Sequence, residues 1–145
     1  MQFAYPYTVT QSEDGAWQVR FQDVPEAMTE GATETEAHEL AADTLIAALG
    51  GLEKLKRPIP EPSKARHRRV VTVPVLQAAK LALYQAMREH GLNNVTLSKR
   101  LGKAENEVRR MIDLDHATKI EALESALQML GKQASLSVDG VKLAA

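Results

Sequence analysis

Residues 93–119 read NNVTLSKRLGKAENEVRRMIDLDHATK. Their apolar residues recur at the spacing of two short helices that share one core. Leu97 and Leu101 are one turn apart on the first helix. Val108 and Met111 are one turn apart on the second helix, on the face that would meet the first. The stretch therefore predicts a helix-turn-helix.

Small residues between these apolar pairs support a tight turn. Ser98 is small enough for the second helix to cross closely, and Gly102 supplies the permissive backbone that a sharp turn requires. The side-chain oxygen of either Asn93 or Asn94 can cap the first helix. The turn and the cap together fix where the first helix begins and ends.

The second helix would present polar side chains away from the core, where a recognition helix contacts DNA. Its asparagine can pair with adenine, its arginines with guanine and its glutamate with cytosine, while nearby lysines suit phosphates. The residues expected to bind DNA are Asn94, Lys99, Lys103, Glu105, Asn106, Arg109, Arg110 and Lys119. The alternative is that arginine and lysine merely solvate the outer face of an ordinary helical domain.

Flanking segments extend this pattern. Pro74 suits the first turn of a preceding helix with an apolar face, and Thr118 with Glu121 forms a capping box for a following helix that stops at Gly131. Residues 134–138 alternate as a short strand whose edge can pair with that of a second copy. In this arrangement, residues 74–138 resemble the lambda-repressor-like, or XRE-type, helix-turn-helix domain. Lys103 departs from the usual apolar residue and Ala104 from the usual Ser or Thr cap.

Charge is distributed unequally along the 145 residues. Residues 1–63 hold four basic and eleven acidic side chains, a net charge of −7, whereas residues 64–145 hold fourteen basic and eight acidic ones, a net charge of +6. A basic half suits the phosphate backbone of DNA, and an acidic half suits a basic protein surface or serves solubility. The absence of cysteine and of any apolar run long enough to cross a membrane predicts a cytoplasmic protein without a membrane partner.

The first half predicts a small sheet and a helix. Aromatic and apolar residues alternate with polar ones along 3–9 and 17–21, on either side of a turn at 13–15, which indicates a hairpin. Pro6 places its part of the first strand at an edge or a bulge. A short third strand should precede Gly31. A helix capped by Thr33 should fray or break at the Gly-Gly pair 50–51, although Leu52 and Leu55 indicate another short turn.

The remainder of the N-terminal half is a proline-rich and basic connection followed by a returning strand. Residues 57–69, RPIPEPSKARHRR, have no apolar period and predict an exposed linker. Residues 68–73 predict a fourth strand that returns to the sheet.

Several motifs of this half resemble the HicB antitoxin family. They are Tyr5-Pro6, Asp14-Gly15, Phe21 with Asp23-Val24-Pro25, Gly31 before Thr33, Glu36 and Ala37, and Ile59-Pro60 with Pro62-Ser63. The resemblance implies a partial RNase H-like β-β-β-α-β domain that binds and blocks a small basic HicA-type toxin, an mRNA-cleaving ribonuclease. It also implies that the C-terminal half represses the shared operon. The residues expected to face the toxin are Glu13, Asp14, Asp23, Glu26 and Glu30.

The sequence argues against catalysis. An RNase H-type site needs several carboxylates that converge on metal ions, one of them on the first strand, and residues 2–9 contain none. The four histidines show no metal-ligand spacing, and the chain lacks a glycine-rich phosphate loop. We expect no catalytic residue, no metal and no cofactor, and an RNA-processing enzyme is disfavoured.

The expected fold class is α+β with two domains. Residues 1–63 form the toxin-binding domain, 64–73 the linker and returning strand, and 74–138 the DNA-binding domain, through which the chain forms a homodimer or a higher oligomer on a palindromic operator. Residues 139–145 form a tail, of which 142–145 have the composition of a cloning remnant. The alternative function is a stand-alone transcriptional repressor whose N-terminal domain senses a small ligand.

Overall fold

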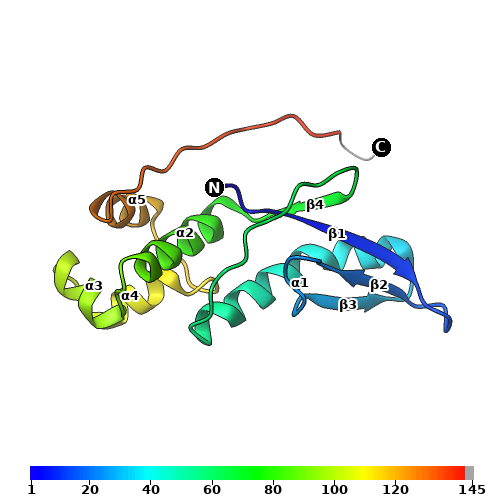
Figure 1. Cartoon of the computed structure of the whole chain (residues 1–145), viewed down its shortest axis with the longest axis horizontal. Helices are drawn as coiled ribbons and strands as arrows, with labels where there is room; N and C mark the ends of the chain where they lie inside the picture. Colours follow the sequence, from blue (N-terminus) through cyan, green and yellow to red (C-terminus); the bar gives the residue numbers. More distant parts are fainter. Residues whose placement is uncertain (143–145) are drawn as a thin grey trace.

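Four antiparallel strands and five helices form within residues 1–142, the part of the chain that the computed structural model describes (Figure 1). The predicted α+β class is confirmed at this level. Figure 1 shows the sheet and the first helix at one end of the molecule and the other four helices at the opposite end. Three residues of the expected cloning remnant, 143–145, lie outside the described residues, so that expectation stays a prediction.

The sheet has the strand order β3-β2-β1-β4. The first half of β1 (Ala4–Gln11) pairs with β4 (Arg69–Thr72), and its second half pairs with β2 (Trp17–Arg20). Strand β3 (Met28–Gly31) completes the sheet beside β2. Pro6 lies in the half of β1 that pairs with β4, before the pairing with β2 begins, so the missing amide is at a local edge as predicted. The returning fourth strand is also confirmed.

Helix α1 (Glu34–Lys54) covers the face of the sheet that carries the alternating aromatic residues (Figure 1). Tyr5 and Val19 are fully buried there, and the rings of Tyr7 and Phe21 have their centroids 5.3 Å apart. Burial of these large side chains provides the main stabilisation of the N-terminal part. The predicted alternation along 3–9 and 17–21 therefore marks the inner face of the sheet.

The start of α1 has the predicted capping residues, but one of the two expected hydrogen bonds goes to a different amide. The Oγ1 atom of Thr33 accepts a hydrogen bond from the Glu36 amide at 3.1 Å. The Glu36 carboxylate accepts from the amide of Ala32 at 2.9 Å, one residue earlier than the cap itself. Two backbone donors that the helix cannot satisfy are thereby paired.

The fraying or break predicted at the Gly-Gly pair is wrong, because α1 continues through Gly50 and Gly51 to Lys54. The further turn that Leu52 and Leu55 indicate is present as the last turn of this helix. Leu52, beyond the pair, is buried and holds the last turn in place. A methyl group at Gly50 would lie 3.7 Å from Leu114 Cδ1, so the glycine faces the helical half of the chain. Tertiary packing thus outweighs the low helix propensity of glycine.

The proline-rich connection after α1 is less free than the sequence predicts. Its backbone carbonyls accept hydrogen bonds from buried or half-buried side chains on both halves: Pro60 O from the Tyr5 hydroxyl at 2.7 Å, Arg57 O from the Tyr84 hydroxyl at 2.7 Å, and Ile59 O from Gln85 Nε2 at 3.0 Å. Ile59 itself is buried. One side of the segment is exposed to solvent, and the other side packs against the sheet and α2.

Four helices make up the rest of the chain: α2 (Val75–Glu89), α3 (Asn94–Leu101), α4 (Glu105–Ile112) and α5 (Ile120–Met129). Pro74 occupies the N-cap of α2, one position before the first-turn position that the sequence predicts. The apolar faces of all four helices join the core that begins in the sheet. No helix in the described part of the chain is both long and apolar enough to cross a bilayer.

The predicted capping box of the last helix is wrong. Helix α5 begins at Ile120 with Lys119 as its N-cap residue, and no side chain caps it. The hydroxyl of Thr118, the predicted capping group, accepts instead from the ammonium of Lys80 at 2.6 Å. A buried donor from another helix therefore competes successfully for this oxygen.

The predicted strand at 134–138 is also absent from the single chain. Residues 132–142 have no regular secondary structure, and Leu136 and Val138 are 69% and 86% exposed. Figure 1 shows this segment extended beyond α5. A strand requires a hydrogen-bonding neighbour, and one copy of the chain does not supply it here.

Candidate functional site

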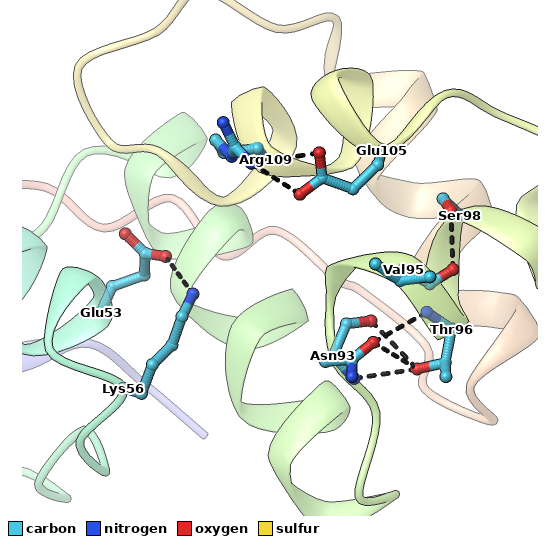
Figure 2. Close-up of polar contacts among 8 residues, drawn as sticks. All are labelled: Glu53, Lys56, Asn93, Val95, Thr96, Ser98, Glu105 and Arg109. Carbon is cyan, nitrogen blue, oxygen red and sulfur yellow. Dashed lines mark hydrogen bonds and ion pairs between the residues drawn. The ribbon is translucent and has the colours of Figure 1, made fainter.

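The region 93–113 contains the residues that the sequence singles out for DNA binding. Asn93, not Asn94, caps α3: its Oδ1 accepts from the amide of Thr96 at 2.8 Å, and Thr96 Oγ1 accepts from the amide of Asn93 at 2.9 Å (Figure 2). This reciprocal pair forms a capping box. Asn94 is consequently the first residue of α3 and is half-buried.

A left-handed glycine ends α3. Gly102 has a φ of 65°, and the Lys103 amide donates back to the carbonyl of Ser98 at 3.0 Å, the six-residue bond of a Schellman motif. The buried hydroxyl of Ser98 donates to the carbonyl of Val95 at 2.6 Å (Figure 2), so this small side chain is satisfied within α3. The chain then turns sharply into α4.

Helix α4 separates apolar and charged residues cleanly. Val108, Met111 and Ile112 are buried, whereas the opposite face carries the exposed side chains of Arg109 and Arg110. Ala104 is the N-cap residue and offers no side-chain hydrogen bond. The helix is therefore held mainly by its apolar face.

Two ion pairs lie on α4 and the turn before it in the free chain. Arg109 Nη2 donates to both carboxylate oxygens of Glu105, at 2.7 and 3.1 Å (Figure 2). Lys103 Nζ lies 3.7 Å from a carboxylate oxygen of Glu107. Both are exposed i, i+4 pairs, which contribute little stability each. Such pairs can open when a stronger partner arrives.

The eight predicted DNA-binding residues form one group and three outliers. Five lie on α4 or the turn before it: Lys103, Glu105, Asn106, Arg109 and Arg110. Lys99 lies on α3 and is exposed, Asn94 begins α3, and Lys119 precedes α5. The single group on α4 is the feature that a groove-reading function requires.

Sequence reasoning missed Lys80 and the actual role of Thr118. Lys80 lies on α2 with none of its surface exposed, and its ammonium donates to the carbonyl of Arg110 at 2.7 Å and to Thr118 Oγ1 at 2.6 Å. A signal was present in the sequence, because Lys80 falls four residues after Leu76 on the apolar stripe of that helix.

The five acidic residues proposed for toxin binding divide between the two ends of β2. Glu13 and Asp14 occupy the turn before β2, and hydrogen bonds from the Ser12 hydroxyl and then the Ala16 amide lower the pKa of Asp14. Glu30, on β3, pairs in register with Gln18 and accepts from its Nε2 at 3.1 Å. These three carboxylates are exposed at or near one end of the sheet.

The other two have partners within the chain. The carboxylate of Asp23 accepts from both the amide and the hydroxyl of Ser63, at 2.8 and 2.9 Å, and Glu26 lies 3.5 Å from the guanidinium of Arg57. Both contacts attach the proline-rich connection to the loop after β2. These two carboxylates therefore have a structural role in the free chain.

Further exposed carboxylates follow β3 directly and were not predicted as site residues. They are Glu34, Glu36, Glu39 and Asp43 on the first half of α1. With Glu13, Asp14 and Glu30, they give the N-terminal part a strongly negative surface. Within residues 1–142, acidic, histidine and cysteine side chains form no group of three or more that could hold a metal ion.

Comparison with known proteins adds a relationship over most of the chain. Residues 4–82 match the family model of HicB-like antitoxins of bacterial toxin–antitoxin systems. The chain is 38% identical to Antitoxin HicB of Escherichia coli (strain K12) over 133 residues, which covers 91% of this chain and 96% of that protein. It is 36% identical to Antitoxin HicB 1 of Photorhabdus laumondii over 137 residues, 93% of this chain and 86% of the relative. Antitoxin HicB of Pseudomonas fluorescens (strain Pf0-1) is 33% identical over 94% of both chains.

Proposed function

Because this chain belongs to the HicB-like antitoxin family of bacterial toxin–antitoxin systems, we propose that it binds and neutralises a HicA-type mRNA-cleaving ribonuclease and represses its own operon. The family consists of antitoxins and not of enzymes, which agrees with the sequence-based expectation. The observation that carries the proposal is the division of charge, −7 over residues 1–63 and +6 over residues 64–145, on a chain with this family assignment.

The toxin is held by the N-terminal half, a partial RNase H-like unit that includes β4. Glu13, Asp14 and Glu30 are exposed and face basic residues that the toxin uses to hold RNA. Asp23 and Glu26 join this surface only if the toxin displaces their contacts with Ser63 and Arg57. The exposed carboxylates at the start of α1 extend the same negative surface. Charge complementarity of this kind mainly speeds association and selects the partner.

The C-terminal half binds operator DNA as a lambda-repressor-like helix-turn-helix, with α4 in the major groove. Asn106 reads adenine, Arg109 or Arg110 reads guanine, and Glu105 accepts from cytosine. The positioning contacts to phosphates come from Asn94, Lys99, Lys103 and Lys119. The exposure of Asn106, Arg109 and Arg110 and the buried apolar face beneath them support this assignment.

Two copies of the chain bind a palindromic operator through the C-terminal half. Dimerisation places the two α4 helices about 34 Å apart, one turn of DNA. The exposed apolar side chains Leu136 and Val138 lie on a segment that alternates as a strand, and pairing of this segment with its symmetry mate would complete the missing strand. The assembly is a homodimer or a higher oligomer built from such dimers.

Copurification and a gel shift together test the proposal. The full chain is expressed with the short basic reading frame beside it and then mixed with the DNA upstream of the operon. The expected result is a stable complex of both proteins, which is recovered from the cytoplasmic fraction and then shifts this DNA. A chain that shifts the DNA but captures no ribonuclease would support a stand-alone repressor, and a chain that does neither would refute both roles.

A further inference from the structure

Lys80 is a fully buried lysine on α2, within the half of the chain to which we assign DNA binding. Burial lowers the pKa of its ammonium below the usual value, and the carboxylate of Asp113 opposes that shift. A buried ammonium is costly unless hydrogen-bond acceptors surround it. A lysine at this position on the apolar face of α2 must therefore have acceptors that compensate for its burial.

The acceptors of Lys80 lie at the end of α4 and just before α5. Its Nζ donates to the carbonyl of Arg110 at 2.7 Å and to Thr118 Oγ1 at 2.6 Å, and the Thr118 hydroxyl donates to the same carbonyl at 3.4 Å. Arg110 belongs to the last turn of α4, where carbonyls have no donor within the helix and the helix dipole is negative. Lys80 thus caps the carboxyl end of α4 from a neighbouring helix.

Helix α4 depends on such outside support. It is eight residues long, and the N-cap residue Ala104 contributes no side-chain bond. Isolated helices of this length are not stable in water. Burial of Val108 and Met111 fixes the rotation of α4 about its own axis. Apolar contacts are not directional, so they define the position of α4 along that axis less well. The directional hydrogen bond from Lys80 to the carbonyl of Arg110, the residue after Arg109, fixes the position of α4 along its axis.

We propose that Lys80, through Thr118 and the Arg110 carbonyl, is the positioning residue that fixes α4 for base reading. This inference rests on the proposed DNA-binding function. Lys80 cannot touch a phosphate, because its side chain is enclosed by the protein. Its loss should therefore reduce the preference for the operator over other DNA, while the salt dependence of binding to any duplex stays the same.

The binding test compares Lys80→Met, Thr118→Val and Thr118→Ser by fluorescence anisotropy. The probes are the duplex upstream of the chain's own operon and a scrambled duplex of equal length. Lys80→Met and Thr118→Val are expected to lose about tenfold of the operator preference, the scale of one misplaced base contact. Thr118→Ser keeps the hydroxyl and should retain the preference. Lys103→Met, the same exchange on the surface, should weaken both duplexes alike and reduce the salt slope.

Amide hydrogen exchange supplies a readout that needs no DNA. Lys80→Met should exchange faster than the wild type at residues 110–114, with the core strands unchanged. Equal operator preference in Lys80→Met and wild type, or unchanged exchange at 110–114, overturns the positioning role. A wild type that does not distinguish the two duplexes overturns the proposed DNA-binding function, and this role with it, whatever the exchange shows. Should Lys80→Met not fold, the contrast between Thr118→Val and Thr118→Ser decides the question.

Discussion

The Nη2 atom of Arg109 bridges both carboxylate oxygens of Glu105, one turn away on the exposed face of α4. The side chain of Arg109 remains 64% exposed in this pair. The two residues to which we assign base reading therefore occupy each other in the free chain. DNA must either replace Glu105 as the partner of Arg109 or accept an arginine that Glu105 holds in place.

Replacing Glu105 by glutamine tests whether Glu105 takes part in recognition. Removal of a negative charge from the groove-facing surface is expected to strengthen binding to all duplexes and to steepen the salt slope by up to about one unit. The preference for the operator should fall at the same time, because an amide replaces the carboxylate that holds Arg109 through both oxygens and that can only accept from cytosine. Anisotropy titrations at several salt concentrations measure both quantities.

Glu124→Gln is the matched control, since it removes an exposed carboxylate on α5. It should leave the operator preference unchanged. If Glu105→Gln discriminates between duplexes as well as the wild type does, Glu105 has no part in recognition.

Arg109 and Lys103 should differ in kind when each is replaced. Arg109→Lys keeps the charge but loses the planar pair of donors that reads guanine, so operator affinity should fall by about 1–3 kcal/mol while scrambled DNA binds as before. Lys103→Ala should weaken both duplexes equally and lower the salt slope by about one. Titrations with single-base operator variants identify the position that Arg109 reads. Equal losses on operator and scrambled DNA for Arg109→Lys would contradict base reading.

The N-terminal fold makes a prediction from two glycines. A methyl group at Gly31 would lie 2.6 Å from the backbone nitrogen of Ala37, so Gly31→Ala must push β3 away from α1 and should cost about 1–3 kcal/mol of unfolding free energy. Gly51→Ala meets nothing within 4 Å inside α1 and should gain about 0.5–1 kcal/mol. Urea denaturation of both variants checks the sign. A neutral Gly31→Ala would show that β3 and α1 are not packed this closely.

Local patterns in the sequence were sufficient for most of the elements. The alternation around Tyr5 and Val19 marks the inner face of the sheet, and the Thr33 and Asn93 caps and Gly102 mark helix ends through atoms only a few residues away. Such signals need no knowledge of the rest of the fold.

The wrong predictions concern residues whose structure depends on contacts with residues far away in the sequence. Thr118 satisfies every local requirement of a cap, yet Lys80, 38 residues earlier, takes its oxygen. The Gly50-Gly51 pair should interrupt a helix, but packing of Leu52 and the contact toward Leu114 keep α1 continuous. The strand at 134–138 requires a neighbour that the single chain does not contain. Among the candidate site residues, the internal partners of Asp23 and Glu26 belong to the same category.

Glu53 should make stability depend on pH. Burial, and to a lesser degree the Asp113 carboxylate, raise its pKa above 4.5, while Lys56, 3.6 Å away, opposes the shift (Figure 2). The folded chain then binds the proton more tightly than the unfolded chain, so stability is lost as the pH rises from about 4.5 through the raised pKa. Glu53→Gln removes this loss, and its stability relative to the wild type should increase over that window.

The difference in unfolding free energy between Glu53→Gln and the wild type is measured by urea denaturation from pH 4 to pH 8, at intervals of about one pH unit. Lys56→Met provides a variant of opposite sign, because removal of the ammonium should raise the pKa of Glu53 further and deepen the loss. A difference between Glu53→Gln and wild type that does not change with pH would show that Glu53 is ionised equally in both states.

Inhibition of the ribonuclease by the purified chain is the decisive experiment for the antitoxin assignment. The basic protein from the adjacent reading frame is incubated with mRNA, and the full chain is titrated into the reaction. We predict that cleavage stops at a stoichiometric ratio. Reversing the charge of Glu13, Asp14 and Glu30 together should raise the amount required by at least about tenfold, since we assign these carboxylates to the surface that attracts the basic partner. Undiminished cleavage at a large excess of the folded chain would contradict the antitoxin assignment.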